Sequence, residues 1–212
     1  MRASLAAMSA VPALKLDRRP APPRPRLDLR TGIVAAGRVD ASGLGFEHWI
    51  ETLAAAREVW NAADRAPPLS APAPAFLFEP GAASRLDALL RGAGFGMRSV
   101  SIEINETDLM IVGEAGLAAI ERLRARGWGV ALVCGAACVL PIGARLRGLL
   151  TEILVDAPET LSPELALDTA PEPLLGRVRA ANNSGIAVTA LNVKSPAHAG
   201  MLIALGFDRG EY

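Results

Sequence analysis

The chain has few of the side chains from which metal sites and catalytic sites are built. It contains two histidines and two cysteines in 212 residues. The cysteines, Cys134 and Cys138, have no second Cys or His pair nearby at the spacing of a zinc site. We therefore expect two reduced thiols in a cytoplasmic protein that holds no metal and no cofactor.

Net charge and long apolar runs are also absent. The 22 basic side chains balance the 22 acidic ones, which argues against a protein that binds nucleic acid or an anionic membrane surface. No apolar run reaches the roughly 18–20 residues needed to cross a bilayer. Aromatic residues make up 4% of the chain, but apolar residues make up 51%, enough for one buried core. We expect residues 1–13 to be a flexible leader and residues 14–212 to form one domain.

The apolar pattern predicts strands that alternate with helices. From Ser99 onward the expected strands are 99–104, 129–133, 153–155 and 186–191, and the expected helices are 114–126, 142–150, 172–182 and 196–205. Before them we expect a hairpin over 26–36, a helix over 46–63, a short strand over 75–78 and a helix over 82–93. This alternation is typical of an open doubly wound sheet or a (β/α)₈ barrel. No GxGxxG or GxxxxGK[ST] motif follows a strand, so we predict the barrel.

Two acids, Glu103 and Glu106, stand where the strand 99–104 ends. They are candidate metal ligands, although acids at strand ends more often hydrogen-bond neighbouring amides or face solvent. The ends of the later strands carry other side chains: Val133, Cys134, Leu154, Leu191 and Lys194. The carboxyl ends of parallel strands meet at one face of a barrel, so this face is expected to be poor in acids and bases.

Six segments, in this order and spacing, resemble an EAL domain. They are Pro25-Arg-Leu-Asp-Leu-Arg-Thr-Gly32, Ser101-Ile-Glu-Ile-Asn-Glu106, Gly127-Trp-Gly-Val-Ala-Leu132, Glu152-Ile-Leu-Val-Asp156, Ala190-Leu-Asn-Val-Lys-Ser195 and Leu205-Gly-Phe-Asp-Arg-Gly210. The EAL family contains bacterial cyclic-di-GMP phosphodiesterases on a TIM-like barrel. The resemblance implies a TIM-like (β/α) barrel of EAL type. We expect it to be trimmed or distorted at its N-terminal units and its C-terminus, where the chain stops at the last strand.

The resemblance also implies that most of the family's metal ligands are missing. Glu103 and Glu106 match the family's Glu-x-Thr-Glu motif, and Asp156 matches the aspartate of its Lys-Ile-Asp motif. The segment 35–40, where the Glu-Ala-Leu motif belongs, has an arginine and no glutamate. The family's remaining ligand positions fall on Val133, Cys134, Leu154, Leu191 and Lys194. Of the family's acidic metal ligands only Glu103 is kept, and one carboxylate cannot hold two divalent cations, so we expect the chain not to be an enzyme.

Three hypotheses for the function follow. The first is a non-catalytic, degenerate EAL-like domain that regulates bacterial signalling by binding an unidentified protein, with a homodimer as an open alternative. Trp49 and Trp128 are its candidate interface residues, because tryptophan is enriched at binding hot spots. The second is a receptor that binds cyclic-di-GMP without hydrolysing it, which the altered pocket positions disfavour. The third is an enzyme with a re-purposed barrel.

Overall fold

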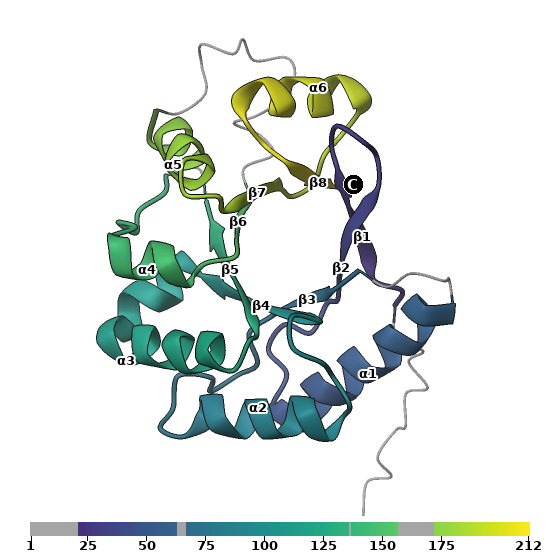
Figure 1. The fold of residues 1–212 in the computed structure, drawn as a ribbon, viewed down its shortest axis with the longest axis vertical. Helices are drawn as coiled ribbons and strands as arrows, with labels where there is room; N and C mark the ends of the chain where they lie inside the picture. Colours follow the sequence, from purple (N-terminus) through teal and green to yellow (C-terminus); the bar gives the residue numbers. More distant parts are fainter. Residues whose placement is uncertain (1–20, 63–66, 136, 157–171) are drawn as a thin grey trace, which may run out of the picture.

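Eight strands form a closed barrel in the computed structural model, which describes residues 21–62, 67–135, 137–156 and 172–212 (Figure 1). In chain order the strands are β1 (Arg24–Asp28), β2 (Val34–Arg38), β3 (Leu69–Pro72), β4 (Val100–Asn105), β5 (Gly129–Cys134), β6 (Glu152–Val155), β7 (Ala187–Ala190) and β8 (Arg209–Glu211). The predicted TIM-like barrel is confirmed. The expected boundary between residues 13 and 14 lies outside the described residues.

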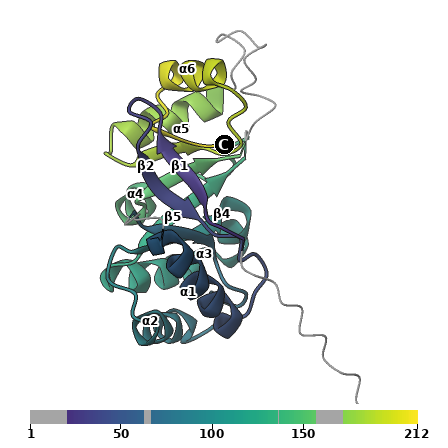
Figure 2. The same cartoon turned by 90° about the vertical axis from the view of Figure 1, so that its right-hand side faces the viewer.

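The barrel is closed on the side where the sequence suggested a distortion. The last strand, β8, runs antiparallel to β1, with Arg26 opposite Glu211. The first two strands form an antiparallel hairpin, and each neighbouring pair from β2 to β8 is parallel. Figure 2 shows this hairpin crossing the front of the barrel. Three residues of β8 are therefore enough to complete the ring.

Helices pack on the outside of the barrel, whereas the β1–β2 hairpin forms its right-hand side in Figure 1. They are α1 (Phe46–Ala62), α2 (Ala82–Gly92), α3 (Glu106–Ala125), α4 (Ala144–Leu149), α5 (Glu172–Asn182) and α6 (Pro196–Leu205). The last one begins and ends as its sequence predicts. The Ser195 side chain accepts a hydrogen bond from the His198 amide, Pro196 follows it, and Gly206 ends the helix at a φ of 95°.

Two elements differ from the sequence prediction. The third strand is β3, not 75–78, because Leu69 pairs with Val100 on one side and with Gly37 on the other. Its proline, Pro72, is the final strand residue, where the missing amide hydrogen is tolerated. The helix α3 begins at Glu106 instead of residue 114, and Gly113 kinks it with a φ of 53°. That kink explains why the apolar helical pattern becomes regular only after Gly113.

Both tryptophans that were expected at an interface are buried in the core. The indole Nε1 of Trp49 donates to the Pro72 carbonyl at 2.6 Å, and Trp128 Nε1 donates to Asp87 Oδ1 at 2.9 Å. Trp49 thus joins α1 to β3, Trp128 joins the start of β5 to α2, and neither presents a contact surface. The assignment of Trp49 and Trp128 to an interface is corrected accordingly.

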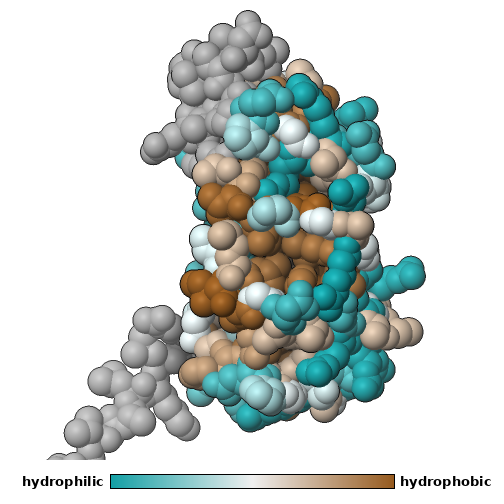
Figure 3. All heavy atoms as spheres, turned by 90° about the vertical axis from the view of Figure 1, so that its left-hand side faces the viewer, coloured by the Kyte–Doolittle hydropathy of each residue, from teal (hydrophilic) through white to brown (hydrophobic). Residues whose placement is uncertain are grey.

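Apolar side chains reach the surface across the middle of the face that carries α3, α4 and α5 (Figure 3). Hydrophilic side chains surround them toward both ends of the molecule. On the same side, a cavity of about 130 Å³ is lined by residues of α5 and by Ile142, Ile153 and Ile186. Within the described residues, no helix is both long and apolar enough to span a membrane.

The close approach of β2 to α1 gives a test of the barrel's packing. A Cβ at Gly37 would lie 2.8 Å from Cζ2 of Trp60. We expect Gly37→Ala to lower the free energy of unfolding by about 1–3 kcal/mol through overpacking, measured by urea denaturation. Gly45→Ala is the control, since its Cβ would meet nothing within 4 Å. Equal stability of the two variants would contradict this packing.

Candidate functional site

A layer of polar side chains fills the inside of the barrel. Side chains alternate along a strand, so Glu103 points inward while its neighbours Ile102 and Ile104 pack in the outer core. The buried polar residues contributed by the strands are Arg26, Ser70, Glu103, Glu152, Thr189 and Glu211. They come from six different strands, so their contacts tie the ring together from within.

The fully buried guanidinium of Arg26 lies at the centre of this layer. Its Nη2 donates to Glu103 Oε1 at 2.5 Å, its Nε to Glu211 Oε2 at 3.3 Å, and its Nη1 to Glu152 Oε2 at 3.5 Å. Burial alone would lower the pKa of Arg26, but the three carboxylates raise it above its ordinary value. The guanidinium is therefore held in its charged form.

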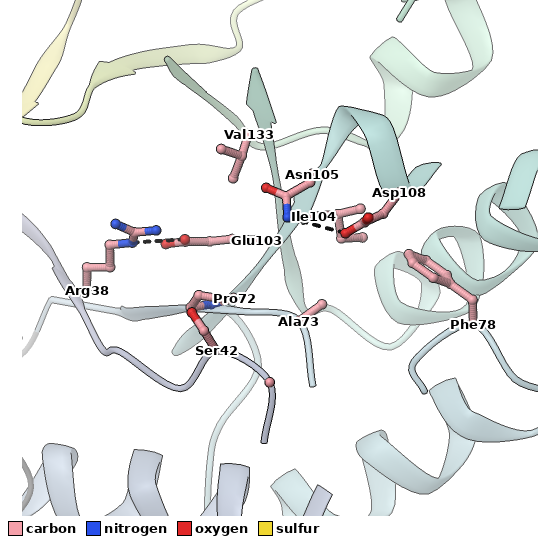
Figure 4. A pocket seen from close by; sticks show the side chains of 11 residues that line it. Arg38, Ser42, Pro72, Ala73, Phe78, Glu103, Ile104, Asn105, Asp108 and Val133 are labelled. Carbon is pink, nitrogen blue, oxygen red and sulfur yellow. Dashed lines mark hydrogen bonds and ion pairs between the residues drawn. The ribbon is translucent and has the colours of Figure 1, made fainter. Parts of the chain in front are cut away.

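Both oxygens of Glu103 have further partners. Arg38 Nε donates to Oε2 at 3.0 Å, as Figure 4 shows, and the Ser70 hydroxyl donates to Oε1 at 2.7 Å. Glu152 is held in the same way, by the Thr189 hydroxyl and by Arg209 Nη1 at 3.3 Å. The arginine noted in the segment 35–40 thus contacts Glu103 directly.

An apolar cluster adjoins the polar layer inside the barrel. Ala131, Leu154 and Leu191 form a buried cluster of their own, and Val133 packs against it. Leu154 and Leu191 each stand two residues after a member of the polar layer, Glu152 and Thr189. Three of the five positions predicted to lack metal ligands therefore meet inside the barrel, as one hydrophobic cluster.

The other predicted site residues do not converge on this cluster. Cys134 faces the outer core, Lys194 is exposed, and Asp156 is exposed and accepts a hydrogen bond from Asn192 Nδ2 at 3.2 Å. Glu106 begins α3 and accepts the amide hydrogens of Gly135 at 3.0 Å and Leu140 at 3.1 Å. The preferred interpretation of the two acids, a hydrogen bond to nearby amides, describes Glu106; Glu103 binds arginine instead.

A pocket of about 250 Å³ opens beside Glu103, at the mouth of the barrel (Figure 4). Its polar lining includes Arg38, Ser42, Asn105 and Asp108. Asn105 Nδ2 donates to Asp108 Oδ2 at 3.3 Å, so these two side chains close one wall. Sequence reasoning did not find Arg26, Glu152, Thr189 or Glu211. For the three charged residues, a signal was available in the sequence: a charged side chain inside a short strand.

No protein-family model matches the chain, and no curated protein matches it in sequence. Solved structures do match its fold. The PaMucR phosphodiesterase in its c-di-GMP complex is 15% identical with a TM-score of 0.72, over 89% of this chain and 87% of that one. The EAL domain of Mycobacterium smegmatis DcpA is 20% identical with a TM-score of 0.70, over 89% and 88%. Klebsiella pneumoniae BlrP1, in a calcium/cy-diGMP complex, is 17% identical with a TM-score of 0.67, over 89% and 52%.

The chain therefore has the fold of EAL domains, and this corrects one expectation from the sequence. We expected the chain not to be an enzyme. The fold is instead one shared with a phosphodiesterase that was solved with c-di-GMP bound, so it is an enzyme fold.

The calcium complex raises the question of whether this barrel suits a divalent cation. Glu103 is the interior acid nearest the mouth pocket, and both of its oxygens bind arginine. Among the residues that the structure describes, no group of three or more His, Cys, Asp or Glu side chains is placed to hold a metal ion. The described residues therefore do not fit a metal ion at this mouth.

Replacing the central arginine tests the polar layer. Arg26→Met removes the one cation that Glu103, Glu152 and Glu211 share and leaves these buried carboxylates with only their outer arginine partners. We expect the free energy of unfolding to fall by about 3–5 kcal/mol in urea denaturation. Arg24→Met is the matched control. Its side chain is 47% exposed and pairs with Glu211 at 3.0 Å, so we expect a loss of less than about 1 kcal/mol. Similar losses for both variants would contradict the central role of Arg26.

Proposed function

We propose that this chain is a cyclic-di-GMP signalling domain that works by binding a protein partner. The supporting feature is an open apolar groove of about 590 Å³ beside the barrel mouth, which we call the Phe76 groove. It lies between the segment that follows β3 and the first turns of α3. Its apolar lining consists of Ala73, Pro74, Ala75, Phe76, Leu77, Phe78, Pro80, Ile111 and Val112.

Two large apolar side chains of the groove are exposed to an extent that favours binding. Phe76 is 67% exposed and Ile111 is 83% exposed. Phe76 also has a φ of 66°, in the left-handed region that a bulky residue rarely adopts. Backbone strain of this kind is concentrated at functional sites, and large exposed apolar patches mark interaction surfaces. Both features support docking at Phe76 and Ile111.

The charges at the groove define the chemistry of the partner. Glu79 and Asp108 line it, and both are exposed. The complementary partner is a segment with apolar side chains for the groove and basic side chains for these two acids. An amphipathic basic helix, laid along the groove with its apolar face inward, meets both requirements.

The signalling assignment draws on the shared fold. PaMucR is a phosphodiesterase solved with c-di-GMP, and BlrP1 was solved with the same dinucleotide. Fold alone does not fix function, so the Phe76 groove carries the binding part of the proposal.

Photo-cross-linking identifies the segment that occupies the groove. A photoreactive phenylalanine analogue replaces Phe76 in one sample and Ile111 in another, in the full chain expressed in its native host. We expect both positions to cross-link to one segment that carries apolar and basic residues. That segment, made as a peptide, should bind the purified protein in a titration. A cross-link from this chain to itself would make the partner a second copy and contradict the proposal.

Three variants then test the recognition chemistry against that peptide. Ile111→Lys removes an apolar contact and places a positive charge against the basic partner segment. We expect at least about 30-fold weaker binding, which corresponds to the roughly 2 kcal/mol of a hot spot. Ile111→Asp removes the same apolar contact but keeps the acidic character, so it should lose less. Ile33→Lys changes a 68% exposed residue at the tip of the β1–β2 hairpin and should have no effect. Equal affinity of the Ile111→Lys and Ile33→Lys proteins would reject the groove as the docking site.

A second candidate function is binding of cyclic-di-GMP at the mouth pocket. Its supporting observation is Arg38, whose guanidinium borders the pocket and is partly exposed. Arginine forms paired hydrogen bonds with phosphate oxygens. In this structure Arg38 already contacts Glu103 and lies 3.6 Å from Glu211, so a phosphate would have to compete with two carboxylates.

Calorimetric titration of cyclic-di-GMP into the purified protein tests this candidate. If the dinucleotide binds at the mouth, we expect a micromolar dissociation constant that Arg38→Met weakens by at least about tenfold, since a charge-assisted hydrogen bond contributes about 1.5–3 kcal/mol. The control, Arg145→Met, removes an exposed arginine that pairs with Glu114 and Glu121 away from the pocket, and it should bind normally. Absence of heat at millimolar nucleotide, or an unchanged affinity in Arg38→Met, would reject nucleotide binding at this mouth.

A further inference from the structure

The two cysteines lie together at the carboxyl end of β5. Cys134 is the last residue of that strand and is fully buried, whereas Cys138, four residues later, is partly exposed. Both contact the same side chain, Arg177, and Cys138 packs against the apolar cluster that contains Cys134. The chain therefore places two cysteines in one small region, one buried and one partly exposed.

A cation is positioned over this pair. Arg177, from α5, donates from Nη1 to Cys134 Sγ at 3.4 Å and from Nη2 to the Cys138 carbonyl at 2.7 Å. The Cys138 thiol donates to the Gly135 carbonyl at 3.4 Å. A neighbouring arginine stabilises thiolate and so favours nucleophilic reactivity.

The two thiols have opposite acidities. The neighbouring Cys138 thiol and burial raise the pKa of the Cys134 thiol well above its ordinary range. The neighbouring Cys134 thiol and the charge of Arg177 lower the pKa of Cys138. The partly exposed cysteine is therefore the better nucleophile, and the buried one supplies the second thiol.

The loop that carries Cys138 is held in place by two buried charged side chains. Glu106 accepts the amide hydrogens of Gly135 and Leu140, and Arg177 donates to the carbonyls of Cys138 and Leu140. Glu106 and Arg177 lie 3.7 Å apart. Within this arrangement Cys138 has a φ of 46°, which L residues rarely adopt. These contacts fix the backbone at Gly135, Cys138 and Leu140 beside Cys134.

We propose that Cys134 and Cys138 are a reversible redox pair, which a low-molecular-weight disulfide oxidises to an intramolecular disulfide. The Cys138 thiolate attacks one sulfur of the oxidant, forms a mixed disulfide and releases one small thiolate. Cys134 then attacks the Cys138 sulfur of the mixed disulfide, so the Cys134–Cys138 bond forms and the second small thiolate leaves. The two protons of the protein thiols end on the two small thiols, and the two electrons reduce the oxidant.

Titration of the full reduced chain with oxidised and reduced glutathione tests this redox pair. After alkylation of the remaining thiols, we expect an oxidised species that lacks the two thiol hydrogens and takes up no alkylating agent. Both cysteines lie in the tryptic peptide 127–145, so the intact peptide mass reports the disulfide directly. Excess dithiothreitol should restore both thiols. Two alkylated cysteines under oxidising conditions, or a disulfide between two chains, would overturn the proposal.

Single variants assign the order of the two steps. Cys134→Ser should stop at a stable glutathione adduct on Cys138, because the second thiol is missing. Cys138→Ser should react at least about tenfold more slowly, because its remaining thiol is buried and its pKa is raised. In denaturant the two variants should react at similar rates, which controls for the intrinsic reactivity of a cysteine. A native Cys138→Ser protein that reacts as fast as Cys134→Ser would contradict this order.

Discussion

A buried positive charge can stay inside a barrel only if carboxylates surround it, and this requirement organises the interior of the chain. The guanidinium of Arg26 is fully buried and contacts Glu103, Glu152 and Glu211. Each carboxylate brings another strand to β1, and β8 closes the ring with Glu211 opposite Arg26. The cost of removing these charges from water is large, so each partner has to be present for the arrangement to be stable.

This requirement also determines which surfaces of the barrel a ligand can reach. The oxygens of Glu103 bind Arg26, Arg38 and Ser70, and the cluster of Ala131, Leu154 and Leu191 beside them is apolar. The features accessible from outside include the pocket at the mouth, the Phe76 groove and the loop that carries Cys138. The proposed partner segment and the proposed redox pair use the second and third of these. The two sites share the start of α3, because Glu106 binds the loop that carries Cys138 and Ile111 lines the Phe76 groove.

The sequence predicts the barrel well and its interior poorly, for physical reasons. Strand and helix periodicity are local, so α5 and α6 have the expected bounds and Ser195 caps α6. The partners of Arg26 lie 77, 126 and 185 residues away in the sequence, and no local pattern reports them.

Short apolar segments and tryptophans were the least reliable signals. The run 75–78 was predicted to be a strand, because a few consecutive apolar residues do not distinguish a buried strand from an exposed loop; it forms the wall of the Phe76 groove instead. Trp49 and Trp128 were assigned to an interface on residue type, yet the core buries both. The positions Val133, Leu154 and Leu191 were judged unable to bind a cation, and they form one apolar cluster in the barrel.

In this description of the barrel, the interior carboxylates bind arginine side chains and not a metal ion. Anomalous diffraction from crystals soaked with manganese and cyclic-di-GMP tests this point most directly. We expect Arg26 and Arg38 to remain bound to Glu103, with no manganese peak inside the barrel. A manganese ion bound to Glu103, with Arg38 displaced from it, would contradict this description of the interior.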